Sequence, residues 1–169
     1  MIEAGVLDEK ERVQLIDGVL VAMTPQGRLH AFVIQRLNRL LVRAVGDDYE
    51  VLTQLPLTLG DESEPEPDLA VVRAEDALSR THHPTTALLV IEVAGDSLRL
   101  DRGSKAALYA RAGVLEYWIV NLAAASVEVH RDPDPASGSY RTITERQRGD
   151  ALEAHAIPGF RFDLRELFD

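Results

Sequence analysis

The sequence LLVIEVA at residues 88–94 decides the fold, because it is a run of six apolar residues interrupted by a single charge. A short run rich in Val, Ile and Leu is typical of a strand that is buried on both faces. Strand alternation places Glu92 on the same face as Val90 and Ala94. A buried carboxylate is costly unless a hydrogen bond, an ion pair or a metal compensates its charge. Glu92 is therefore the first candidate for a functional residue.

A second carboxylate begins the preceding apolar segment. Asp68 follows Pro67 at the start of a predicted strand over 68–73. Two carboxylates on neighbouring strands suit Mg²⁺, which binds one or two protein carboxylates, keeps several waters and leaves other positions to phosphate oxygens. Pro-Asp is also common turn chemistry. Asp68 is therefore a candidate only in combination with Glu92.

Lysine is rare in this chain, which has two Lys and sixteen Arg. Lys105 comes thirteen residues after Glu92, in a predicted helix over 102–112. That helix, packed back on the strand, could aim the ammonium at a metal site, where it would position a water or stabilise charge developing on a phosphate. Asp101 and Tyr109 share its helical face, so that Asp101 could orient Lys105 and Tyr109 could lend a hydroxyl. The simpler alternatives are a solvated helix residue and an i,i+4 partner of Asp101.

The rest of the chain predicts a mixed α/β fold. Asp17-Gly18 accepts the positive φ angles of a hairpin turn, and residues 28–45 have the apolar spacing of a helix. Further strands are expected at 50–59, 116–122, 127–131 and 140–144. Because no linker divides these elements, residues 1–169 are expected to form one domain with a central mixed β-sheet flanked by helices.

Composition excludes several classes of function. The chain of 169 residues has no cysteine, which excludes disulfide frameworks, thiolate zinc sites, iron–sulfur clusters and cysteine nucleophiles. Its net charge of −10 argues against coating nucleic acid or anionic membrane by bulk charge. No apolar run approaches the roughly 20 residues of a membrane helix, and no signal peptide is visible. The default expectation is a cytoplasmic protein without a membrane partner.

Four segments of the chain resemble the Uma-two family, restriction-endonuclease-like proteins of the PD-(D/E)xK nuclease superfamily. They are EPDLAVV (66–72), LLVIEVA (88–94), DRGSK (101–105) and LYARAGVLEYWIV (108–120), and the resemblance covers nearly the whole chain. It implies a restriction-endonuclease-like fold and a site that hydrolyses DNA with Mg²⁺ or Mn²⁺. Relatives often have another helix upstream, so the N-terminus is expected to be shortened.

The resemblance also implies roles for individual residues. Asp68, Glu92 and Lys105 would be catalytic, and Asp68, Glu92 and the backbone carbonyl of Val93 would bind the metal. In the superfamily the lysine usually stands two residues after the Glu, at the position of Ala94 here. Lys105 would then be that lysine, shifted onto the next helix. The candidates for supporting or substrate-contacting residues are His30, Gln54, Asp101, Arg102 and Tyr109.

Two departures from the family pattern keep an alternative open. Many relatives have Glu where this chain has Val19, and Asp where it has Asn121. Together with the acidic charge, they favour a second hypothesis: a catalytically weak or inactive nuclease-like protein that acts in interactions. In either case a homodimer or higher homo-oligomer is expected. A third hypothesis is a metallohydrolase of small phosphoesters. The sequence leaves open whether Arg99, Arg102, Lys105 and Arg111 form a local positive rim.

Overall fold

A computed structural model describes residues 12–23, 25–77, 79 and 81–169. Its centre is a six-stranded sheet in the order β3-β4-β5-β6-β7-β8. The strands are β3 (Tyr49–Thr53), β4 (Leu69–Arg73), β5 (Leu89–Ala94), β6 (Glu116–Asn121), β7 (Ser126–Asp134) and β8 (Ser139–Gln147). In this sheet β5 and β6 are parallel, and the other neighbouring pairs are antiparallel. The mixed sheet that the sequence predicts is confirmed.

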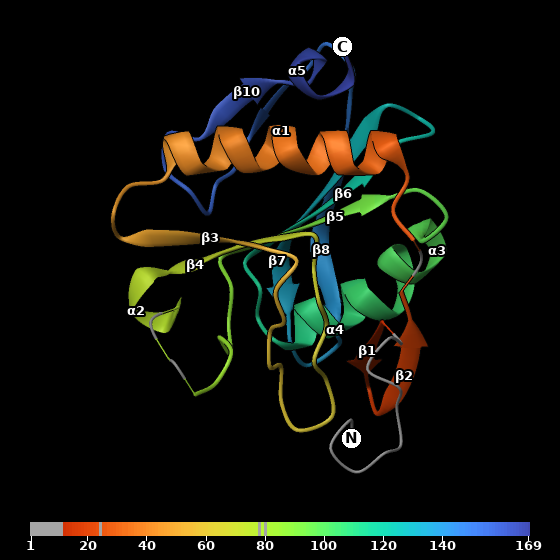
Figure 1. Ribbon diagram of the computed structural model, residues 1–169, viewed down its shortest axis with the longest axis vertical. Coiled ribbons are helices and arrows are strands. Elements are labelled where there is room, and N and C mark those ends of the chain that lie inside the picture. The colour runs from red at the N-terminus through yellow and green to blue at the C-terminus, as the bar shows by residue number, and fades with distance from the viewer. Residues whose placement is uncertain (1–11, 24, 78, 80) are drawn as a thin grey trace.

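Helices cover both faces of the sheet, with α1 above and α4 below the strands in Figure 1. The long helix α1 (Arg28–Ala44) lies on one face. On the other face, α3 (Leu98–Leu100), a π-helical turn η1 (Asp101–Lys105) and α4 (Ala106–Arg111) follow one another. This segment carries the chain from β5 to β6, as parallel strands require a crossover.

Smaller elements complete the fold. A separate hairpin consists of β1 (Val13–Ile16) and β2 (Val19–Ala22). Its turn residues Asp17 and Gly18 have φ angles of 48° and 76°, which confirms the predicted turn. The remaining elements are α2 (Ala74–Ala77), β9 (Ala151–Glu153), β10 (Arg161–Asp163) and α5 (Arg165–Phe168). No helix among the described residues is long and apolar enough to cross a membrane.

Two apolar layers fix the position of β5 in the middle of the fold. Alternate residues of β5 face α1 and α4: Ile91 and Val93 belong to the layer under α1, and Val90 to the layer under α4. All six residues of β5 are buried, as are all six of β6. Fully burying a Val or Ile side chain contributes about 1.5–3 kcal/mol. The layers therefore hold Glu92, in the middle of β5, in a fixed place.

The structure corrects several predicted boundaries. The strand expected at 50–59 ends at Thr53, because Gln54 has a φ of 53° and Pro56 cannot donate to a ladder. The helix expected at 102–112 begins earlier, at Leu98, and contains the π turn. The strands β9 and β10 were not predicted. The prediction of a shortened N-terminus falls on residues 1–11, which lie outside the described residues.

Candidate active site

Asp68 and Glu92 lie opposite each other on neighbouring strands. In the antiparallel pairing of β4 with β5, Leu69 is opposite Ile91, so the residue before Leu69 is level with the residue after Ile91. The Asp68 carboxylate accepts a 2.8 Å hydrogen bond from the backbone N–H of Val93. Gln54 donates from Nε2 to the other Asp68 oxygen at 3.4 Å. Strand pairing thus brings together the two carboxylates that the sequence singled out.

Glu92 is almost completely buried, with 4% of its surface exposed. Its Oε1 atom lies 2.8 Å from Nζ of Lys105 and accepts a 2.8 Å hydrogen bond from the hydroxyl of Tyr109. Burial raises the pKa of Glu92 to about 8, although the Lys105 ammonium acts in the opposite direction. The negative charges of Asp101 and Asp68 add to the rise. Burial and the neighbouring carboxylates thus both disfavour the charged form of Glu92 when no cation is bound.

Lys105 is buried against two carboxylates. Its Nζ lies 3.7 Å from Oδ1 of Asp101, in addition to its contact with Glu92. Burial by itself would lower the pKa of Lys105, but the attraction of Glu92 and Asp101 outweighs it and the pKa is raised. The ammonium consequently stays charged at neutral pH. The alternative of a solvated lysine is wrong, because only 4% of Lys105 is exposed, whereas the i,i+4 contact with Asp101 is present.

Asp101 is held in place from two sides. Its Oδ2 accepts a 2.6 Å hydrogen bond from Ser97, and its backbone carbonyl accepts one of 3.0 Å from the hydroxyl of Tyr117. Burial raises the pKa of the Asp101 carboxyl, against the effect of Lys105. Its Oδ1 is buried without a hydrogen-bond partner in the described structure. Asp101 is thus positioned to orient the Lys105 ammonium.

The side chains that reach Glu92 come from one helical segment. Lys105 ends the π turn η1, and Tyr109 lies in α4 directly after it. Asp101, which contacts Lys105, opens the same turn. A π turn is wider than an α turn and is frequent at functional sites. The four-residue spacing in the sequence indicated this shared face, but we find no sequence signal for the π turn itself.

His30 brings the start of α1 to the same place. Its Nε2 lies 3.3 Å from Oδ2 of Asp68. Hydrogen bonding to Asp68 raises the pKa of His30, although burial opposes the rise, and the backbone of Val93 adds to it. Its Nδ1 atom is buried and has no hydrogen-bond partner among the described residues. His30 therefore lies against Asp68, one of the two candidate carboxylates.

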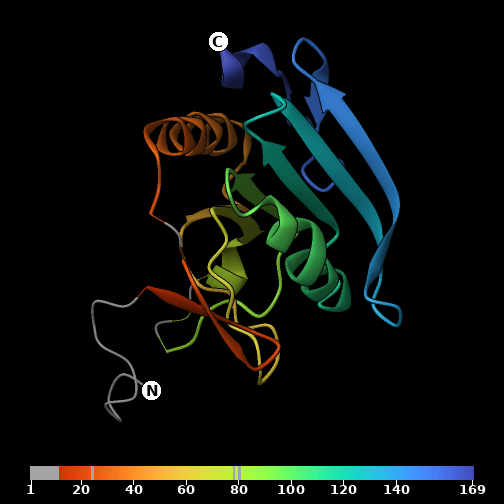
Figure 2. The same cartoon turned by 90° about the vertical axis from the view of Figure 1, so that its right-hand side faces the viewer.

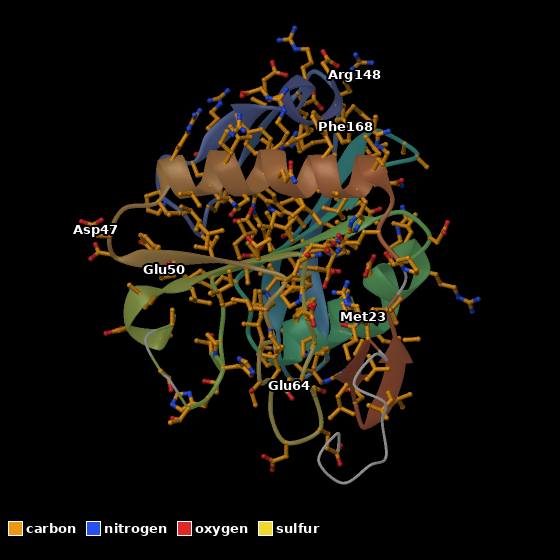
Figure 3. The ribbon with its side chains drawn as sticks, viewed as in Figure 1. Met23, Asp47, Glu50, Glu64, Arg148 and Phe168 are labelled. Atoms are coloured by element: carbon orange, nitrogen blue, oxygen red, sulfur yellow. The ribbon has the colours of Figure 1, made fainter. Side chains whose placement is uncertain are left out.

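A cavity of about 70 Å³ opens onto these groups. Its lining includes the carboxylates, Lys105, His30 and Val93, and also four polar residues that the sequence did not indicate: Gln14, Gln26, Glu66 and Ser97. Met23, labelled in Figure 3, lines it just after β2. Of these residues, only Gln14 could have been found from the sequence, because strand alternation places it on the same buried face of β1 as Ile16.

The donors around this cavity fit Mg²⁺ better than zinc. Within the described parts of the chain, no group of three or more His, Cys, Asp or Glu side chains could hold a metal, whereas structural zinc needs about four such ligands. Mg²⁺ needs only about one or two carboxylates, and the rest of its shell is water. Asp68, Glu92 and the Val93 carbonyl offer hard oxygen ligands, and the cavity is large enough to hold water.

The positive rim considered from the sequence does not form. Arg102 donates a 2.8 Å hydrogen bond from Nε to Glu128. Glu128 is on β7, two strands away from β5, which carries Glu92. Arg111 is paired with Asp17 at 2.7 Å. Because Lys105 is held by Glu92, three of the four proposed cations are already neutralised by carboxylates. Arg102 in particular does not line the cavity.

The two departures from the family pattern also lie away from the cavity. Val19 is 60% exposed on β2. Asn121 ends β6, and its side-chain oxygen accepts a 3.1 Å hydrogen bond from the backbone of Ala124, which closes the following turn. Neither side chain lines the cavity. A carboxylate missing at these positions therefore removes no ligand from this site.

Comparisons with known proteins show the family and the fold of the chain. The model of the family Uma2, described as "Putative restriction endonuclease", matches residues 3–165. Among solved structures, the chain is similar to the crystal structure of "a putative nuclease belonging to DUF820" from Anabaena variabilis ATCC 29413. The TM-score is 0.77 at 13% identity, over 98% of this chain and 94% of that chain, which shows a shared fold. No curated protein matches the chain.

Proposed function

The chain belongs to the Uma2 family of restriction-endonuclease-like proteins, and on that premise we propose that it is a metal-dependent endonuclease that hydrolyses phosphodiester bonds in DNA. The observation that carries the proposal is the convergence of Asp68, Glu92 and Lys105 on one cavity. They come from the residue before β4, from β5 and from η1. The proposed cofactor is Mg²⁺ or Mn²⁺, bound by Asp68, Glu92 and the backbone carbonyl of Val93.

Each residue has a role that follows from its contacts. A bound divalent cation would polarise the phosphate and lower the pKa of a bound water. The Lys105 ammonium, kept charged by its two carboxylates, offsets the negative charge that develops on the phosphate or positions the water. Tyr109 fixes one oxygen of Glu92, and Gln54 and His30 hold Asp68. Asp101 acts through Lys105 and is a positioning residue.

The alternative of an inactive interaction protein loses one of its two arguments. Val19 and Asn121 do not line the cavity, so they do not weaken the proposed site. The net charge of −10 remains unfavourable for DNA binding by the chain as a whole. The expected homodimer or higher homo-oligomer stays a prediction.

Nicking of supercoiled plasmid tests the proposal. The parent protein should nick the plasmid with Mg²⁺ or Mn²⁺ and not with EDTA. The variants Asp68→Asn, Glu92→Gln and Lys105→Ala should each lose about 10²-fold or more of the rate. Glu128→Gln is the matched control for Glu92→Gln, since Glu128 is buried on the same side of the sheet but pairs with Arg102 outside the cavity. Variants that nick as fast as the parent would show that the activity is a contaminant and that the proposal fails.

A further inference from the structure

Four arginines form a stripe along the exposed side of α1. The α1 arginine stripe consists of Arg28, Arg36, Arg39 and Arg43. At 3.6 residues per turn these positions lie within a sector of about 80° around the helix axis. The opposite side of the helix, with Val33, Leu37 and Leu41 among its buried residues, packs on the sheet. The helix contains no Asp or Glu, although the whole chain has a net charge of −10.

The charges of this stripe are not neutralised within the described structure. None of its four arginines lies within 4.0 Å of a carboxylate of residues 12–23, 25–77, 79 or 81–169. Elsewhere in the fold, arginines such as Arg102, Arg111 and Arg131 are ion-paired. Within the stripe, the Arg36 guanidinium lies over the ring of Phe32, 5.2 Å from its centre. A positive field therefore persists here on an acidic protein.

The stripe begins at the candidate active site. His30, in the first turn of α1, contacts Asp68. Arg28 lines a second cavity of about 310 Å³, which it shares with His30, Val93 and Ser97. From Arg28 to Arg43 the stripe extends about 22 Å along the helix axis, at 1.5 Å per residue. Figure 2 shows α1 nearly end-on.

We propose that the α1 arginine stripe binds the phosphate backbone of the DNA that flanks the cleaved bond. The inference rests on the proposed function and adds the surface that holds its substrate. Guanidinium groups pair with phosphate oxygens in a fork geometry, and contacts of this kind position a duplex without reading its sequence. A local basic surface of this kind is what an acidic DNA enzyme requires.

Duplex DNA fits this surface better than an anionic membrane does. A helix that lies in a membrane interface inserts its apolar face between the lipids. The apolar face of α1 is already buried against the sheet through Val33, Leu37 and Leu41. Leu29, Phe32 and Val42 are exposed on α1, but Arg36 lies over the Phe32 ring and Val42 lies ten residues further along the helix. The continuous apolar face is therefore covered by the sheet, and the charges of the stripe remain available for a phosphate backbone.

Two triple variants with the same change in net charge test the proposal. The stripe variant is Arg28→Gln, Arg39→Gln and Arg43→Gln. The control is Arg73→Gln, Arg146→Gln and Arg161→Gln, three exposed arginines on β4, β8 and β10 without an ion pair among the described residues. Fluorescence anisotropy measures the affinity for a fluorescein-labelled duplex of about 20 base pairs, in Ca²⁺, from about 50 to about 200 mM NaCl.

The stripe variant should bind the duplex about 10-fold more weakly or worse. The slope of log affinity against log salt should become shallower by about 2–3, because each lost phosphate contact reduces the size of that slope by about 0.9. The control should bind like the parent. If both variants bind equally, or if the stripe variant keeps its DNA affinity and instead loses binding to vesicles of phosphatidylserine and phosphatidylcholine, the proposal is overturned. If the triple stripe variant unfolds in thermal melting, the single variants Arg43→Gln and Arg146→Gln replace the two triple variants. Arg43→Gln should then bind the duplex more weakly than Arg146→Gln, and equal affinities would overturn the proposal.

The two proposals can fail separately. If the parent nicks plasmid and the stripe variant binds DNA like the control, the proposed function stands and the role of the stripe is rejected. If the parent binds the duplex through the stripe but never nicks plasmid, the role of the stripe stands and the proposed function is rejected.

Discussion

The ammonium of Lys105 lies 2.8 Å from Oε1 of Glu92, although thirteen residues separate the two in sequence. Both residues are 4% exposed. The contact joins the π turn η1 to the middle of β5, so the helical crossover delivers the lysine to the strand that carries the carboxylate. The predictions below follow from this buried pair and from the groups around it.

We expect the stability of the metal-free protein to fall as the pH rises through the neutral range. The pKa of Glu92 is about 8 in the folded state and roughly 4.3 in an unfolded chain. The folded state therefore binds more protons between these values, and the free energy of unfolding decreases as the pH rises through them. The raised pKa of Asp101 acts with the same sign.

Melting temperatures in EDTA, measured from about pH 5 to about pH 9, check this expectation. Glu92→Gln should flatten the decline, because glutamine does not titrate. A variant curve parallel to that of the parent would show that Glu92 is not the titrating group.

Tyr109→Phe should slow nicking by weakening the hold on Glu92. The change removes the 2.8 Å hydrogen bond to Oε1 without opening a large cavity. We expect kcat to fall by about 10-fold, which corresponds to about 1.4 kcal/mol, with little change in KM. Tyr140→Phe is the matched control, because its hydroxyl donates to the backbone of Val114 outside the cavity. Equal kcat values for the two variants would count against this role of Tyr109.

Asp101→Asn should change the pH profile of the reaction. The carboxylate helps to keep the pKa of Lys105 raised, so its loss lowers that pKa. The high-pH limb of kcat/KM should therefore begin at a lower pH than in the parent. Asp163→Asn, which removes an exposed partner of Arg165, should leave the limb in place. If Asp101→Asn lowers the rate but leaves the profile unmoved, the residue has a structural role only.

Glu116→Gln should cost stability without affecting the metal site. Glu116 is buried and accepts hydrogen bonds from Trp118, Arg131 and the backbone of Ala156. Breaking such a buried pair typically costs about 3–5 kcal/mol, which urea unfolding measures. Affinity for Mn²⁺ should equal that of the parent, and a large loss would show that the two clusters are coupled.

Much of the site could be predicted from the sequence because strand alternation and helical spacing are local rules. They place Glu92 inward on β5 and place Asp101, Lys105 and Tyr109 on one helical face. The same rules could not rank Glu92 above Glu116, which also sits in an apolar strand but is fully satisfied by Arg131 and Trp118. Glu92 was singled out by its place inside the apolar run 88–94, and the family resemblance then implied its role in metal binding.

Long-range contacts account for what the sequence did not predict. The pairing of Arg102 with Glu128 joins η1 to β7, and Gln14 reaches the cavity through the packing of the β1–β2 hairpin. Neither contact has a local pattern. The expectation that residues 1–169 form one domain stays a prediction.

The most direct measurement of the central claim is the anomalous scattering of Mn²⁺ in soaked crystals. At millimolar Mn²⁺, the account predicts a peak between the carboxylates of Asp68 and Glu92, within reach of the Val93 carbonyl, that disappears in Asp68→Asn. No peak at this position in the parent protein, or a peak of equal height in Asp68→Asn, would contradict it.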